Sequence, residues 1–179
     1  MEVKILAAAP PSALQKWFWW LLTGNILFIA GTTAWLYPFS AADILSFETA
    51  GKLLKAEPIL LDWLTAGKLP LALRAIYLDY AFILLYVSFL SVAALFLSRL
   101  TGHEILIRFG RGMSWMLIVA GACDVIENMF MLRSLNHGLT AFNVALTYDM
   151  AAAKFTVVIL ALLFGLVCLI YWLSSRFSR

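Results

Sequence analysis

The sequence predicts an all-α membrane protein, a four-helix transmembrane bundle formed by a single domain over residues 1–179. Hydrophobic residues make up 64% of the chain and charged residues 13%, against about 45–50% and about 25% in soluble domains. The mean hydropathy is +0.93. A water-soluble fold of this composition would expose apolar patches far larger than the few hundred Å² or so that a soluble monomer tolerates. The same composition excludes a disordered chain.

Four apolar segments are long enough to cross a bilayer, which takes about 20 residues of helix. We expect all four to be helical, because backbone N–H and C=O groups facing lipid must be paired within the segment. Tryptophan and tyrosine residues mark both ends of the first segment, as is typical of the membrane–water interface. The predicted spans are 17–37, 76–97, 113–132 and 155–173.

Lysine and arginine are unevenly distributed between the two sides that these spans define. The N-terminus, the 99–112 connection and the C-terminus hold seven Lys and Arg against two Glu, whereas the other side holds five Lys and Arg against five Asp and Glu. By the positive-inside rule we expect both termini to be cytoplasmic. The net charge of +3 contains no basic run, so nucleic acid is not an expected partner.

The segment 38–75 lies on the outer side in this topology, and its sequence predicts two short helices. Ser40 and Asp43 have the spacing of a capping box that opens the first helix. Pro58 suits the first turn of the second helix, and Gly67 supplies a stop. Both helices carry their apolar residues on one side. We therefore expect two helices between residues 41 and 66 that lie in the outer interface.

Trp63 is expected to face the apolar layer of the membrane from the second of these interfacial helices. Two interpretations of the 38–75 segment remain open. It is a surface cover, or it is a lid over a site in the bundle below.

Polar residues inside the apolar spans are the strongest functional signal, since an ionisable group at mid-bilayer costs about 2.5–3.5 kcal/mol on insertion scales. Asp124, Glu127 and Asn128 follow the i, i+3, i+4 pattern, so one face of the third span presents all three. Asp79 in the second span and Lys154 at the start of the fourth complete this set of polar residues. The set therefore holds three carboxylates and a single lysine.

The depths of these residues predict that they meet. At about 1.5 Å per residue, Asp79 lies about 5 Å below the outer boundary and the acids of the third span about 6–12 Å below it. Lys154 opens the fourth span at the rim, and Tyr86 shares the helix face of Asp79. We therefore expect a binding site in the outer half of the bundle, formed by Asp79, Tyr86, Asp124, Glu127, Asn128 and Lys154.

This set has a structural and a functional interpretation. It is either a buried ion-pair network that holds the helices together, or a site for a ligand. Asp79, Asp124 and Glu127 are the candidate catalytic residues, because paired carboxyl groups with shifted pKa values act as general acid and base. The same acids would suit a cationic or polar-headed lipid, and an oxygen-only set would suit Mg²⁺ or Ca²⁺.

The sequence identifies no cofactor and no reaction. Cys123 and Cys168 form no Cys-x-x-Cys pair, and His103 and His137 lie in connecting segments, so we predict no metal ligands among them. The chain contains no nucleophile elbow, no His-Glu metal motif and no glycine-rich phosphate loop. Whether the protein is an enzyme stays open.

Four short stretches carry a resemblance to a known group of proteins: Phe47–Gly51, Leu78–Phe82, Asp124–Asn128 and Ala153–Phe155. With these stretches the chain resembles small, uncharacterised bacterial four-helix integral membrane proteins. The resemblance covers most of residues 45–160. It implies the four-helix topology and a bacterial cytoplasmic membrane, and it implies no activity.

The leading functional hypothesis is binding of a membrane lipid or small amphiphile at the intramembrane carboxylate site, with or without its chemical conversion. The first alternative is a proton- or cation-coupled transport component, which would have to be a homo-oligomer because four helices rarely enclose a water path. The second alternative is an accessory subunit of a larger membrane complex, in which the polar residues serve assembly.

Overall fold

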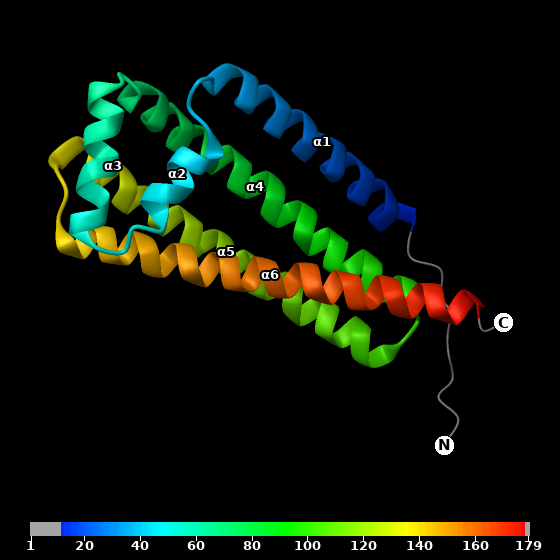
Figure 1. Cartoon of the computed structure of the whole chain (residues 1–179). Coiled ribbons are helices and arrows are strands. Elements are labelled where there is room, and N and C mark those ends of the chain that lie inside the picture. The colour runs from blue at the N-terminus through cyan, green and yellow to red at the C-terminus, as the bar shows by residue number, and fades with distance from the viewer. Residues whose placement is uncertain (1–11, 178–179) are drawn as a thin grey trace.

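The computed structural model describes residues 12–177, and these residues are 90% helical, with six helices and no strand (Figure 1). The predicted all-α class is therefore confirmed for the described part of the chain. Glu2, Lys4 and Arg179, which enter the charge argument for orientation, lie outside the described residues. The helices are α1 Ser12–Leu36, α2 Ala41–Glu48, α3 Leu53–Thr65, α4 Leu69–Leu100, α5 Glu104–His137 and α6 Ala141–Phe177.

Three of the described helices, α4, α5 and α6, are long and apolar enough to cross a membrane. With 32, 34 and 37 residues they extend well past the spans predicted from the apolar runs, because helical hydrogen bonding continues beyond the apolar stretch. Helix α1 corresponds to the first predicted span and has 25 residues, but it is not among these three. Four tryptophans, three threonines and Asn25 interrupt its apolar sequence.

The long helices form a core of three with α1 on one flank. Helices α4, α5 and α6 pack pairwise against one another, whereas α1 packs mainly along α4. Figure 1 shows α1 beside α4 and well away from α6. Asn25, the buried residue of α1, donates its Nδ2–H to the carbonyl oxygen of Leu85 on α4 at 3.2 Å, and Phe28 stacks on Phe82 with ring centroids 5.8 Å apart.

Helices α4 and α5 lie close together at two glycines of α5. A Cβ atom at Gly110 would lie 2.8 Å from the carbonyl oxygen of Ala94, and one at Gly121 would lie 2.8 Å from Cγ2 of Val87. Any larger residue would push the two helices apart at these points. The close contact fixes the α4–α5 pair that carries most of the polar residues.

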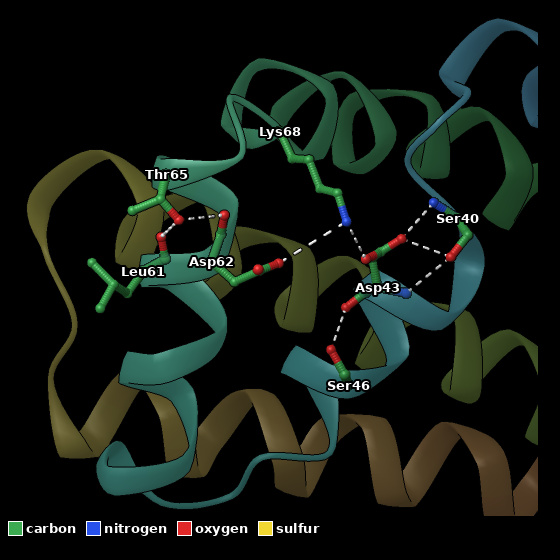
Figure 2. Close-up of polar contacts among 7 residues, drawn as sticks. All are labelled: Ser40, Asp43, Ser46, Leu61, Asp62, Thr65 and Lys68. Carbon is green, nitrogen blue, oxygen red and sulfur yellow. Dashed lines mark hydrogen bonds and ion pairs between the residues drawn. The ribbon is translucent and has the colours of Figure 1, made fainter.

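Helix α2 opens with the predicted capping box. The backbone N–H of Asp43 donates to Ser40 Oγ at 3.3 Å, and the backbone N–H of Ser40 donates to Asp43 Oδ2 at 2.7 Å (Figure 2). Lys68, at the start of α4, lies 3.3 Å from Asp43 Oδ1 and 4.0 Å from Asp62 Oδ2. These contacts tie α2 and α3 to the beginning of α4.

The predicted position of Pro58 in its helix is wrong. Helix α3 begins at Leu53, so Pro58 lies inside it, one turn later than predicted. The helix tolerates this proline at the loss of one backbone donor. The predicted stop is confirmed, because α3 ends at Thr65 and Gly67 follows with φ of +66°.

The predicted orientation of Trp63 toward lipid is also wrong. Trp63 is 1% exposed, and its ring packs against Phe39 at 5.3 Å and Phe47 at 5.4 Å between centroids. Helices α2 and α3 therefore form a cover that packs on the ends of α4, α5 and α6 rather than only on a bilayer. The core under this cover comprises Phe39, Phe47, Ala50, Ala56, Trp63, Ala72, Ile76, Met131 and Val144.

Candidate functional site

The ammonium group of Lys154 lies at the centre of the buried polar residues. Its Nζ is 2.7 Å from Asp124 Oδ1, 2.9 Å from Glu127 Oε2 and 3.6 Å from Glu48 Oε2. No side chain of these four is more than 9% exposed. Helices α2, α5 and α6 thus each contribute to one charged group, which we name the Lys154 cluster together with Tyr86 of α4.

The prediction that Lys154 opens the last helix is wrong. Helix α6 begins at Ala141, thirteen residues earlier, which places Lys154 about 20 Å along its axis. At that position the side chain is enclosed by α5 and the cover. The four-carbon stem therefore directs the ammonium to carboxylates of the protein instead of to the membrane surface.

Asp124 is the fully satisfied acid of the cluster. Its Oδ1 accepts a hydrogen bond from Lys154 Nζ at 2.7 Å, and its Oδ2 accepts one from the hydroxyl of Tyr86 at 2.8 Å. Asp124 is 3% exposed. A charge-assisted hydrogen bond to one oxygen and a phenol hydrogen bond to the other satisfy this buried carboxylate within the fold.

Glu127 is the under-satisfied acid. It is 0% exposed, and neither of its carboxyl oxygens has a hydrogen-bond partner among the described residues. Oε2 lies 2.9 Å from Lys154 Nζ and forms an ion pair with it. A buried acceptor without a donor is rare and calls for a proton, a water or a ligand to complete it.

Glu48 is the residue that the sequence interpretation missed, since it was counted with the surface charges of the outer face. It is the last residue of α2 and is 7% exposed. Burial raises the pKa of Glu48 above its ordinary value, by more than the attraction of Lys154 lowers it. The missed signal was its spacing, because Ile44, Phe47 and Glu48 follow i, i+3, i+4 on the buried face of α2.

Asp79 and Asn128 form a separate pair beside the cluster. Asn128 donates its Nδ2–H to Asp79 Oδ2 at 2.7 Å, which links α5 to α4. Asn128 is 2% exposed, whereas Asp79 is half-buried. Of the six predicted residues, the structure places Tyr86, Asp124, Glu127 and Lys154 in the cluster and joins the remaining two to each other.

Among residues 12–177, no group of three or more His, Cys, Asp or Glu side chains is arranged to hold a metal ion. Cys123 and Cys168 are free thiols in this range. The position at which a cation would meet the carboxylates is taken by the Lys154 ammonium. The Lys154 cluster therefore presents three carboxyl groups, one ammonium group and one phenol.

The chain matches no protein-family model, no curated protein and no solved structure. Its resemblance to small bacterial four-helix membrane proteins accordingly stays a prediction. Function has to be inferred from the side chains that the fold brings together.

Proposed function

We propose that the protein is an integral membrane protein whose Lys154 cluster binds the polar group of a lipid or small amphiphile. The observation that carries this proposal is the imbalance of the cluster. Glu48, Asp124 and Glu127 surround a single ammonium, and the carboxyl group of Glu127 lacks a hydrogen-bond donor. A ligand with an amine or hydroxyl head group would supply that donor, and a protonated amine would also offset the excess of negative charge.

Four membrane spans with both termini cytoplasmic are part of this proposal. Helix α1 is about 37 Å long at 1.5 Å per residue, enough to cross the hydrocarbon layer. Trp17 and Trp20 near its start are 60% and 74% exposed, as expected for an interfacial belt. The α2–α3 cover then lies at the outer face, with Leu54 (81% exposed) and Leu61 (61%) available to the bilayer.

An amphiphile would enter sideways, between α1 and α6. These helices make few contacts with each other, because α1 packs mainly on α4. The half-buried ring of Tyr86 lies 5.4 Å from that of Phe82, which in turn stacks on Phe28 of α1. This aromatic wall leads from the flank of α1 to the Tyr86 hydroxyl and Asp124.

The test is the set of lipids retained by the full chain, purified in mild detergent and identified by mass spectrometry. We expect an amphiphile with an amine or hydroxyl head group to be retained by the wild type and lost on Glu127→Gln or Glu48→Gln. Glu57→Gln is the matched control, since Glu57 lies in the same 38–75 segment but is exposed. Identical lipid profiles in all four proteins would overturn the proposal.

The proximity of Glu48 and Glu127 to one ammonium group favours a second candidate, a proton-coupled transport component. Both acids lie within 3.6 Å of Lys154 Nζ, and two neighbouring acids share a proton readily. Proteoliposomes loaded with a pH-sensitive dye distinguish this candidate. Proton flux that disappears in Glu127→Gln, together with an unchanged lipid profile, would favour transport over lipid binding.

The topology is tested by single cysteines introduced into a variant that lacks Cys123 and Cys168. We expect an impermeant thiol reagent to label Gly67→Cys on intact cells and to leave Ser12→Cys unlabelled. The opposite pattern would reverse the orientation. Labelling at both positions would mean that α1 does not cross the membrane.

A further inference from the structure

A surface hollow separate from the Lys154 cluster lies where α4 begins and α5 ends. Its volume is about 520 Å³, and Tyr77, Leu132, Arg133, Asn136 and His137 line it. These residues belong to the end of the molecule that carries α2 and α3, as the start of α4 and the yellow end of α5 show in Figure 1. A volume of this size is in the range of about 300–1,000 Å³ that is common for small-molecule sites.

The polar groups of the hollow are hydrogen-bond donors without partners among residues 12–177. Arg133, Asn136, His137 and the Tyr77 hydroxyl make no side-chain hydrogen bond or ion pair with another described residue. None of the described residues that line the hollow is Asp or Glu. An arginine beside further donors, with no acid to neutralise it, is suited to a phosphate group, which the guanidinium binds through two parallel hydrogen bonds.

The hollow lies on a flank of the helix pair, next to the α2–α3 cover rather than beneath it. Ile76 and Met131 immediately precede Tyr77 and Leu132, and they are buried under the cover at 1% and 0% exposure. One further residue turns the side chain by about 100°, which brings Tyr77 out to 61% exposure.

The hollow also lies at the edge of the apolar part of α5. The apolar run of this helix ends at Leu132, and Arg133, Asn136 and His137 follow it directly. Tyrosine and arginine at such an edge are typical of the head-group layer of a membrane, where an apolar body and a polar tip are both accommodated.

We propose that this hollow binds a phosphate group, presented by the head group of an anionic phospholipid. Arg133 binds the phosphate oxygens, and Asn136 and His137 donate to the remaining head-group oxygens. The ring of Tyr77 and the side chain of Leu132 contact the glycerol and the first acyl carbons. The site is distinct from the Lys154 cluster and does not depend on the ligand proposed there.

The test is native mass spectrometry of the full chain in detergent, titrated with phosphatidylglycerol or with zwitterionic phosphatidylcholine. We expect preference for phosphatidylglycerol, and we expect Arg133→Gln to weaken its binding about tenfold through loss of one bidentate charged contact. Arg74→Gln is the matched control. Arg74 is exposed on α4 three residues before Tyr77, does not line the hollow, and should change binding less than about twofold.

Equal losses in the Arg133 and Arg74 variants would assign the preference to general surface charge and overturn the site, as would no loss in either. Asn136→Ala repeats the test without a change of charge and should weaken binding by about threefold. Displacement of the lipid by millimolar inorganic phosphate would overturn the lipid as the source of the phosphate group. Arg133→Gln should leave the retention of an amine-headed amphiphile by the Lys154 cluster unchanged, so this inference and the proposed function fail independently.

Discussion

Helix α2 carries two carboxylates, Asp43 and Glu48, that both face a lysine and behave in opposite ways. Asp43 Oδ1 lies 3.3 Å from Lys68 Nζ, and both side chains are more than 20% exposed. Asp43 Oδ2 also accepts hydrogen bonds from the backbone N–H and the hydroxyl of Ser40 (Figure 2). Glu48 lies 3.6 Å from Lys154 with both side chains below 10% exposed. A carboxylate–lysine pair thus forms a surface contact at one end of the helix and a buried contact at the other.

The pKa values of these two acids shift in opposite directions. Burial alone would raise the pKa of Asp43, but hydrogen bonds from Ser40 and Lys68 together hold it below its ordinary value. At Glu48 burial dominates, and the pKa is raised despite the nearby ammonium. The distance between an acid and a lysine therefore does not decide whether the pair stabilises the fold. The number of hydrogen bonds to the acid, set against its loss of water, decides it.

The largest expected effect is that of removing the buried lysine. Lys154→Met leaves the carboxylates of Asp124, Glu127 and Glu48 without a cation and should cost about 3–5 kcal/mol of unfolding free energy. Thermal and denaturant unfolding of the purified protein in detergent measure this cost. Adding Asp124→Asn should restore part of it, because one stranded charge is then removed. A double variant as unstable as the single one would contradict this account of the cluster.

The second-largest effect is expected for the Tyr86 hydroxyl, which donates a hydrogen bond to Asp124. Tyr86→Phe removes its donor to Oδ2 and should cost about 1.5–3 kcal/mol, the range for a hydrogen bond to a charged group. Tyr80→Phe is the matched control on the same helix, since the Tyr80 hydroxyl makes no hydrogen bond within the described part of the chain. Equal melting temperatures for the two variants would show that the bond to Asp124 does not stabilise the fold.

The comparison within α2 predicts opposite pH dependences. An acid with a raised pKa in the fold binds its proton more tightly there than in the unfolded chain. Stability therefore falls as the pH rises above the ordinary value of 4.5 for Glu48. Glu48→Gln should remove this loss and gain about 1 kcal/mol at pH 8 while changing little at pH 4. Melting curves between these pH values check the slope, and a parallel shift at every pH would contradict it.

The contribution of Asp43 to stability depends on pH in the opposite direction. Its contribution is present above the ordinary pKa of 3.8 and is lost as the pH falls through the lower value in the fold. Asp43→Asn should therefore lower stability at neutral pH and have less effect in strong acid. Melting curves of this variant alongside those of Glu48→Gln measure the contrast directly. Two curves of the same slope would mean that burial does not separate the two acids.

The smallest effect is expected at the surface lysine. Lys68→Met removes contacts of 3.3 Å and 4.0 Å to Asp43 and Asp62, but exposed ion pairs contribute only about 0–1 kcal/mol. The change in unfolding free energy should therefore stay below about 1 kcal/mol and shrink further at high salt. A cost comparable to that of Lys154→Met would show that the exposed and the buried ion pairs of α2 do not differ in their contribution to stability.

Much of the fold could be read from the sequence because the relevant rules are local. The 64% hydrophobic composition and the long apolar runs predict membrane helices, and Ser40 and Asp43 specify a helix start by their spacing alone. Helices α3 and α6 begin earlier than predicted, because the local signals point to Pro58 for one and to the apolar run from Phe155 for the other. Packing against neighbouring helices extends both helices past those local signals.

Asp124, Glu127 and Asn128 share one face of a helix, and this follows from their spacing and from 3.6 residues per turn. Which partner each of them meets depends on how the helices pack. Asp124 pairs with Lys154 and Tyr86, and Asn128 pairs with Asp79. Glu48, 76 residues before Asp124 along the chain, joins them only because Phe47 and Trp63 anchor the α2–α3 cover on the long helices. Periodicity fixes the direction of a side chain from its own helix, whereas its neighbours depend on which distant segment packs against that face.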